Sequence, residues 1–411
     1  GAPEGGAPAD STMTASMNTT ERPPLEGMKV LDFTYLLPGP YGSMMLADLG
    51  ADIIKIENFN NPDLMRISAP FVDGVSAAYA HINRGKRSLG LDLKNPGARA
   101  IVLRLLRDYD IVLEQFRPGV MERLGLGYDE VRKAAPSVIY CSLTGYGRTG
   151  RYAERAGHDI NYLALSGIDS YSGREATGPA LSGIQIADVC AGGKNLAIAV
   201  MAAYIRRLAG GGGAFIDLSI TDSTFALSAF QAAGFLAGGG EPAREGEILN
   251  GGAVYDYYRT SDGRHLSVGS LEPKFAEAFY RAVGMDEMVS PGLLSREELA
   301  ASKRRVAEII ASRTLEHWRG VFAGIDACVE PVLTLAEAVE SPPLADRSMV
   351  TEVRNHAGRT LRQVASPVRV GGEHTARDAG TPLGHHNTAI LASLGYSPDE
   401  IEEFRKNGVI N

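Results

Sequence analysis

A histidine and an aspartate, each at the predicted start of a helix, are the residues of this chain best suited to acid–base chemistry. His158 stands in the stretch Arg155-Ala-Gly-His-Asp-Ile-Asn-Tyr-Leu-Ala-Leu-Ser-Gly167, and Asp188 is followed by Val-Cys-Ala-Gly-Gly193. Two such groups on opposite faces of a small substrate can remove a proton from carbon on one side and return it on the other. The simpler interpretation is that His158, Asp159 or Asp188 only caps a helix. The rest of the chain decides between the two.

Composition favours a globular enzyme. The 411 residues are 44% hydrophobic and 22% charged, which is enough for a sizeable core and for two lobes. The net charge of −8 argues against a nucleic-acid partner, and no run reaches the ~18 apolar residues that a membrane span needs. Three widely spaced cysteines predict no disulfide, no metal site and a reduced, cytoplasmic location. Residues 1–24 are predicted to be a disordered tail without the features of a signal peptide.

Apolar segments that alternate with helical ones predict an α/β fold. Strands are expected at 28–33, 52–56, 88–93, 111–114, 138–143 and 215–220. Parallel strands joined by crossover helices form a doubly wound, Rossmann-like sheet. This large domain is predicted to span residues 25–225 and to be completed by residues 341–411. Residues 226–340, with a hairpin at 255–269 and helices after it, predict a smaller α+β domain, and segment 340–385 is expected to wrap back as a loop.

Basic residues in two places predict a site for a phosphorylated ligand. Arg84, Lys86 and Arg87 surround a glycine turn, and Arg117 and Arg123 follow the fourth predicted strand. Ligands of parallel sheets bind beyond the carboxyl ends of the strands. Guanidinium groups bind phosphate through both charge and a planar pair of donors. We therefore predict phosphate contacts from these residues.

Two glycine-rich segments lie beside the predicted catalytic residues. The motif Gly145-Tyr-Gly-Arg-Thr-Gly150 has the spacing of a nicotinamide-cofactor fingerprint, but the small-residue helix and the acidic residue of that fingerprint do not follow. We interpret it as a flexible loop beside the active site. Gly192 and Gly193 are expected to let a ligand approach the backbone, and the positive end of a helix would keep Asp188 ionised.

The chain resembles the family III coenzyme A transferases and, within them, the branch of α-methylacyl-CoA racemases. Arg84-Gly-Lys-Arg-Ser-Leu89 and Arg117-Pro-Gly-Val-Met121 look like general family features, whereas the run at 156–167 and Glu272-Pro-Lys-Phe275 look specific to the racemases. The resemblance covers about residues 26–410. It implies a large Rossmann-like domain and a small domain, in a homodimer whose two chains interlock like rings.

The resemblance also implies which residues form the site. The catalytic pair would be His158 and Asp188, with Glu272 as a supporting acid, and CoA would be part of the substrate with no further cofactor. Contacts to acyl-CoA are implied for Leu91, Asp92, Leu93, Glu114, Gln115, Phe116 and Arg123, and for Ala156, Gly157, Asp159, Ile160 and Asn161. Asn58 departs from the family, because the racemases tend to carry an arginine after the second strand.

The expected activity is racemisation of 2-substituted acyl-CoA thioesters through an enolate. His158 and Asp188 would exchange the α-proton on opposite faces, Glu272 would orient the histidine ring, and backbone N–H groups near Gly192 or in the 156–161 turn would hold the enolate oxygen. The alternative is a CoA transferase in which Asp188 is a nucleophile and neither His158 nor Glu272 is needed. A catalytically inactive CoA-binding protein is a third interpretation, which the complete set of three residues disfavours. The acyl group is left open.

Overall fold

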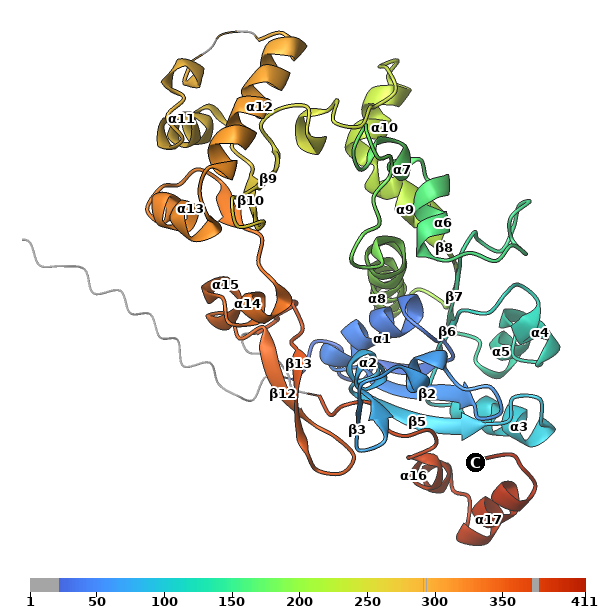
Figure 1. Ribbon diagram of the computed structural model, residues 1–411. Helices are drawn as coiled ribbons and strands as arrows, with labels where there is room; N and C mark the ends of the chain where they lie inside the picture. Colours follow the sequence, from blue (N-terminus) through green and yellow to red (C-terminus); the bar gives the residue numbers. More distant parts are fainter. Residues whose placement is uncertain (1–21, 291, 293, 372–376) are drawn as a thin grey trace, which may run out of the picture.

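The computed structural model describes residues 22–290, 292, 294–371 and 377–411 (Figure 1). Most of the predicted tail at 1–24 therefore lies outside the described residues. The larger part of the molecule is built on a six-stranded sheet in the order β5-β2-β1-β6-β7-β8. Its strands are β1 (Lys29–Asp32), β2 (Asp52–Asn58), β5 (Lys86–Leu91), β6 (Ile111–Glu114), β7 (Ile139–Thr144) and β8 (Ala214–Ser219).

Every neighbouring pair of strands in this sheet is parallel. Numbered by their sequence within the sheet, the strands follow the order 3-2-1-4-5-6, which is the order of doubly wound dinucleotide-binding sheets. The direction of the chain connections reverses between β1 and β6. The prediction of a parallel α/β sheet is thus confirmed. Because the connections run in opposite directions from this point, they leave a gap between them at the carboxyl edge of the sheet.

Helices cover both faces of the sheet, because successive residues of a strand point to opposite sides. Val30 packs into one core with Leu196, and Leu31 packs into the other with Ile101. The first face is covered by α1 (Pro38–Asp48), α6 (Asp159–Leu165) and α8 (Lys194–Leu208). The second is covered by α3 (Pro96–Leu105), α5 (Tyr128–Ala134), α16 (Asn387–Ser393) and α17 (Pro398–Lys406). The last of these begins with a capping box of Ser397 and Glu400.

The long helix beside the sheet is mostly apolar. The π-helical segment η2 (Ile186–Gly193) continues directly into α8, and together they form the segment Ile186–Leu208 of 23 residues. By length and composition alone this segment could cross a membrane, contrary to the expectation from the sequence. One side of it packs into the core beside the sheet, where Leu196 and Val200 have no exposed surface, whereas Ile198 and Ile205 are exposed.

The smaller part of the molecule has a core of its own. There β9 (Asp256–Arg259), β10 (His265–Val268) and β11 (Val329–Pro331) form an antiparallel sheet, as the predicted hairpin requires. It packs with α11 (Pro273–Ala282), α12 (Arg296–Ala311) and α13 (Leu315–Phe322) around the buried Phe279 and Trp318. The predicted hairpin and these three helices are confirmed. The domain limits at 226 and 340 stay a prediction.

The segment predicted to wrap back as a loop contains regular structure. It forms α15 (Pro342–Ala345) and an antiparallel hairpin of β12 (Val350–Arg354) and β13 (Thr360–Val364). Val353 packs against Tyr79 and Ala379, so the hairpin is fixed to the larger part of the molecule. A separate tertiary core, rather than local sequence preference, therefore stabilises this region.

The remaining elements lie within these two parts or between them. They are η1 (Leu64–Ile67), β3 (Phe71–Val72), β4 (Val75–Ser76), α2 (Ala77–Ile82), α4 (Val120–Arg123), α7 (Ile168–Tyr171), α9 (Ile220–Leu227), α10 (Ala229–Leu236), η3 (Ile248–Asn250), η4 (Asp286–Met288) and α14 (Leu335–Val339). The chain leaves the large sheet through α9 and α10 and returns through α14, α15 and the hairpin, so that one chain has a ring-shaped outline (Figure 1).

Candidate active site

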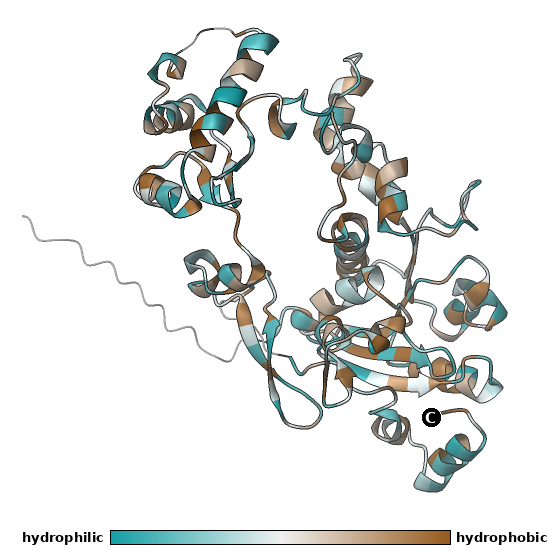
Figure 2. Ribbon diagram, viewed as in Figure 1, coloured by the Kyte–Doolittle hydropathy of each residue, from teal (hydrophilic) through white to brown (hydrophobic). Residues whose placement is uncertain are grey.

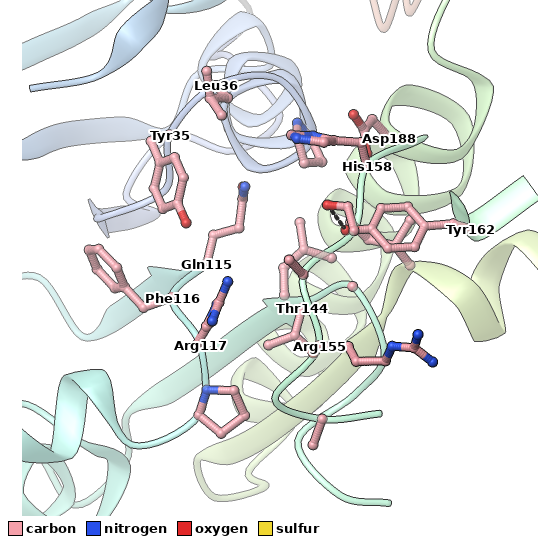
Figure 3. Close-up of a pocket in the computed structure, with 18 residues that line it drawn as sticks. Tyr35, Leu36, Gln115, Phe116, Arg117, Thr144, Arg155, His158, Tyr162 and Asp188 are labelled. Atoms are coloured by element: carbon pink, nitrogen blue, oxygen red, sulfur yellow. Dashed lines mark hydrogen bonds between the residues drawn. The ribbon is translucent and has the colours of Figure 1, made fainter. Parts of the chain in front are cut away.

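The cavity that contains His158 and Asp188 lies at the carboxyl edge of the large sheet. Its volume is about 280 Å³, and its walls include Tyr35 after β1, and Phe116 after β6. These two strands flank the point at which the connections reverse, which is where ligands of doubly wound sheets bind. Arg117 also lines the cavity, as its place after β6 predicted. Figure 3 shows these side chains around the cavity.

His158 occupies the position just before α6. Its backbone is extended (φ −129°, ψ 173°), and its N–H donates to Oδ1 of Asn161 at 3.0 Å. Asn161 thus closes the first turn of the helix and fixes the direction in which the histidine leaves the backbone. The histidine is exposed and lines the cavity, with its ring beside Asp188 (Figure 3).

Tyr162 holds the turn before His158 in place. Its hydroxyl donates to the carbonyl oxygen of Gly157 at 2.7 Å. A Cβ at Gly145 would lie 2.6 Å from this hydroxyl, and a Cβ at Gly157 would lie 2.7 Å from the tyrosine ring. Both glycines are therefore needed for close packing. Of the Gly145 motif, Gly145 itself is thus needed because a tyrosine from a different segment packs on it, a contact that no local pattern in the sequence reveals.

Asp188 lies inside the π-helical segment η2, two residues after its start. Its backbone N–H donates to Oδ1 of Asp159 at 2.9 Å. Burial, followed by the negative charge of Asp159, raises the pKa of Asp188 to about 6, against the opposing effect of His158. The predicted effect of a helix end, which would favour the ionised form, is therefore outweighed by burial and by the charge of Asp159. A carboxyl group with this pKa can both hold and release a proton near neutral pH.

The glycines after Asp188 serve the contact between η2 and α1. A Cβ at Gly193 would lie 2.7 Å from the carbonyl oxygen of Pro38, and a Cβ at Gly42 would lie 2.5 Å from the carbonyl oxygen of Gly193. Gly192 and Gly193 are both buried. They let two helices approach each other closely, and they do not give a ligand access to the backbone as predicted.

Glu272 is not part of this cavity within one chain. It is exposed at the position before α11, in the smaller part of the molecule, and it does not line the cavity of His158. Figure 1 shows α11 across the ring from α6. The predicted role of Glu272 beside His158 is thus not fulfilled by the same chain.

Two further cavities continue the site along the carboxyl edge. The first, of about 340 Å³, shares Tyr35, Leu36 and Phe116 with the catalytic cavity. Its walls are mainly apolar and include Leu93 and Val120, and Asn58 lies in the same wall. The result is a continuous path from His158 and Asp188 past the ends of β1 and β2.

The last cavity on this path, of about 350 Å³, is basic. It shares Lys94 and Leu124 with its apolar neighbour and is also lined by Arg99 and Arg123. Among the described residues, neither Lys94 nor Arg123 forms an ion pair, so both charges are available to an anion. Arg123 was predicted from the sequence. Lys94 was missed, although it follows β5 as Arg117 follows β6.

The basic loop predicted to bind phosphate lies at the opposite edge of the sheet. Lys86 is the first residue of β5, whereas the cavities lie beyond the carboxyl ends of the strands. Arg84 Nη2 is 2.7 Å from Asp48 Oδ2, Lys86 Nζ is 3.2 Å from Asp32 Oδ2, and these side chains are at most 4% exposed. Arg87 pairs with the first residue of β2. The phosphate contacts predicted for Arg84, Lys86 and Arg87 are corrected, because each charge already has an acidic partner and none of the three residues lines the cavities of the site.

The other predicted ligand contacts are divided by the structure. Gln115, Phe116, Ala156 and Gly157 line the catalytic cavity and Leu93 lines the next two, whereas Leu91, Asp92, Glu114, Asp159, Ile160 and Asn161 line none of the three. Leu91 has no exposed surface, and its backbone forms a bridge with Ile410. Glu114 is fully buried, and burial raises its pKa to about 7 despite hydrogen bonds from Ser142 and the Phe116 N–H. Leu91 and Glu114 therefore belong to the buried interior beside the site and not to the walls of its cavities.

Comparison with known proteins agrees with this geometry. Residues 25–387 match the family model described as CoA-transferase family III. The chain is 33% identical to the human (Homo sapiens) alpha-methylacyl-CoA racemase over 94% of this chain and 97% of that protein. It is 32% identical to the succinate–glutarate CoA-transferase of Agrobacterium fabrum over 91% and 96% of the two chains. A crystal structure of a CAIB/BAIF family protein from Brucella suis superposes with a TM-score of 0.80 at 30% identity, covering 91% of this chain and 100% of that one.

Proposed function

This chain belongs to the CoA-transferase family III and is an acyl-CoA-acting enzyme of that family, and from that premise we propose that it is a racemase of 2-substituted acyl-CoA thioesters. The observation that carries the proposal is the pair of His158 and Asp188 on the wall of one cavity. The raised pKa of Asp188 suits a group that must give and take a proton.

The reaction needs the two groups on opposite faces of the substrate α-carbon. One group removes the α-proton, the electrons of the C–H bond move toward the thioester carbonyl, and an enolate forms. The other group then protonates the carbon from the opposite side, and the carbonyl is restored. The pair carries a single proton in both resting forms, on His158 or on Asp188. N–H groups in the 156–161 turn are candidates to hold the enolate oxygen.

The three connected cavities suit the parts of an acyl-CoA molecule. Lys94 and Arg123 offer unpaired positive charges for the phosphates of CoA. The apolar stretch past Leu93 and Phe116 fits the less polar chain that leads to the sulfur. This assignment brings the thioester to His158 and Asp188, with the acyl group beyond them.

The racemase proposal includes a homodimer of interlocked chains. The helix α10 carries mainly apolar residues (Figure 2), yet none of them is buried, and Phe230 and Leu236 are each 75% exposed. Apolar helix faces of this kind require a covering partner. A second ring-shaped chain would cover them and would bring its own Glu272 toward the cavity of the first.

Light scattering at micromolar concentration is expected to give twice the mass of one chain. Phe230→Asp combined with Leu236→Asp is expected to shift the protein toward the single-chain mass, since both charges would be buried in the interface. Exchange of Arg304 and Arg305 for aspartate, on an exposed face of α12, serves as the control for added negative charge. A single-chain mass for the parent protein would contradict the proposed dimer.

A CoA transferase is the alternative within the same family. The transferase from Agrobacterium fabrum is almost as similar as the racemases, and Asp188 lines an open cavity. In that reaction the Asp188 carboxylate would attack the thioester carbonyl and would form an anhydride. That step uses Asp188 as an anion and gives His158 no proton to carry.

Deuterium exchange distinguishes the two reactions. In D2O, a single enantiomer of a 2-methylacyl-CoA is expected to take up deuterium at the α-carbon and to drift toward a mixture of both enantiomers. Mass spectrometry and chiral chromatography measure the two changes. Transfer of CoA to an added carboxylate, with the α-hydrogen retained on a substrate that binds, would overturn the racemase proposal.

A further inference from the structure

The side chain of Asp159 connects the two helices that carry the proposed catalytic pair. It follows His158 directly in the chain, and it accepts the backbone N–H of Asp188 at 2.9 Å. The two aspartates are separated by 29 residues. This hydrogen bond therefore joins the start of α6 to the interior of η2.

The helices that pack against η2 are α1, α6, α8 and α9, and few of the charged groups in this region act on Asp188. On these elements the titratable groups are His158, Asp159 and Tyr162 of the α6 region, Tyr41 and Asp48 of α1, Lys194, Tyr204, Arg206 and Arg207 of α8, and Asp222 of α9. Asp159 raises the pKa of Asp188 and His158 lowers it, and no other side chain among the described residues shifts it. Asp159 is thus the one neighbouring carboxylate that acts on this group.

We infer that Asp159 is a positioning residue for the proposed proton exchange: its carboxylate anchors the backbone of Asp188 and holds a fixed negative charge beside the Asp188 carboxyl. Anchoring fixes the path from the Asp188 carboxyl to the substrate. The charge disfavours a second anion at Asp188 and so favours the form in which Asp188 carries the proton. The consequence for catalysis rests on the proposed racemase function, whereas the contact itself does not.

The charge matters because a racemase must work in both directions. A pair that shares one proton has two forms, one with the proton on His158 and one with it on Asp188, and each form deprotonates one enantiomer. An ordinary aspartate would almost always leave the proton on the imidazole, because carboxyl groups titrate well below histidines. The negative charge of Asp159 increases the share of the form in which Asp188 holds the proton, so that both enantiomers meet a competent enzyme.

Two variants separate the anchor from the charge. Asp159→Asn keeps an oxygen that accepts the Asp188 N–H but removes the charge, and Asp159→Ala removes both. Asp169→Asn is the matched control, because it removes the same charge from the neighbouring helix α7, and Asp169 does not affect the pKa of Asp188. Circular dichroism and the dimer mass show whether each variant is folded.

The first measurement is the titration of Asp188 itself, by ¹³C NMR of protein labelled at the aspartate carboxyl carbon. The Asp188 signal is identified by its loss in Asp188→Asn. In Asp159→Asn the pKa of Asp188 is expected to fall by roughly 0.5–1 unit, with no change in Asp169→Asn. An unchanged pKa in a folded Asp159→Asn protein would overturn the inference, whether or not the enzyme is a racemase.

The second measurement is the rate of α-deuterium exchange for each enantiomer across pH. In Asp159→Asn the exchange that needs protonated Asp188 is expected to slow several-fold at pH 7, and its pH dependence is expected to move to lower pH. The exchange that starts from ionised Asp188 is expected to be retained. Asp159→Ala is expected to slow both enantiomers, because the anchor is lost as well. Equal slowing of both enantiomers in Asp159→Asn contradicts the charge role, and absence of exchange in the parent contradicts the proposed function instead.

Discussion

Alanine in place of either His158 or Asp188 is expected to stop racemisation and to leave deuterium exchange on one enantiomer only. The remaining group can still remove the α-proton from its own face and return a deuteron there, which labels the substrate without inverting it. Since the two groups serve opposite faces, the two variants are expected to retain exchange on opposite enantiomers. On the other enantiomer, the rate of deuterium exchange should fall by about 10²–10⁴-fold, as is usual when a general acid–base group is removed.

Chiral separation of the thioester followed by mass spectrometry measures inversion and labelling in the same sample. His317→Ala provides the control, because this exposed histidine belongs to α13 in the smaller part of the molecule. Loss of exchange on the same enantiomer in both variants would show that only one group carries the proton. Full activity without His158, with inactivity only in Asp188→Ala, is the pattern of a transferase and would count against the racemase.

Removing the two unpaired cations of the basic cavity is expected to weaken binding of CoA strongly. Lys94→Ala combined with Arg123→Ala deletes two charge-assisted contacts, each worth about 1.5–3 kcal/mol. About 1.4 kcal/mol corresponds to a tenfold change in Kd, so the double variant is expected to bind at least tenfold more weakly in calorimetry. The salt dependence of binding should become shallower as well, since fewer charges are screened.

A matched pair of cations and a matched ligand make this test specific. Arg132→Ala with Lys133→Ala removes the same charges from α5, where both residues pair with acidic side chains of their own helix, and it is expected to leave Kd unchanged. The parent protein should prefer CoA over CoA without its 3′-phosphate, and the Lys94–Arg123 variant should lose most of a preference that depends on this cavity. Equal affinity for CoA in the parent and in the Lys94–Arg123 variant would place the phosphates elsewhere.

Local patterns in the sequence determined the elements and the residues with the chemistry. The apolar runs predicted the strands of the large sheet, because most of these strands are buried on both faces. The edge strand β8 differs, since its residues alternate between half-buried and exposed. His158 and Asp188 stood out as acid–base groups. Arg117 and Arg123 were expected at the carboxyl edge of the sheet, because they follow a strand and all strands of a parallel sheet end at the same edge.

Only the tertiary structure decided which charged side chains are free to bind a ligand and which are already paired with an acidic side chain. In the sequence, Arg84 and Lys86 look like ligands for phosphate. In the structure both side chains are buried and pair with Asp48 and Asp32, which lie 36 and 54 residues away in the chain. Contacts of this kind have no local signature. Lys94 was overlooked for the opposite reason, since a lone lysine in a sequence gives no sign that it lacks a partner.

The state of Asp188 also depended on long-range packing. The sequence placed it at the start of a helix, where it would be ionised, but the glycines that follow allow η2 to press against α1, and Asp188 becomes half-buried inside a π-helical segment. Burial and the carboxylate of Asp159 then raise its pKa to about 6. The sequence around Asp188 was therefore enough to identify it as an acid–base group. Its pKa was decided by residues that only folding brings beside it, because the electrostatic cost of a charge depends on the surroundings of the group.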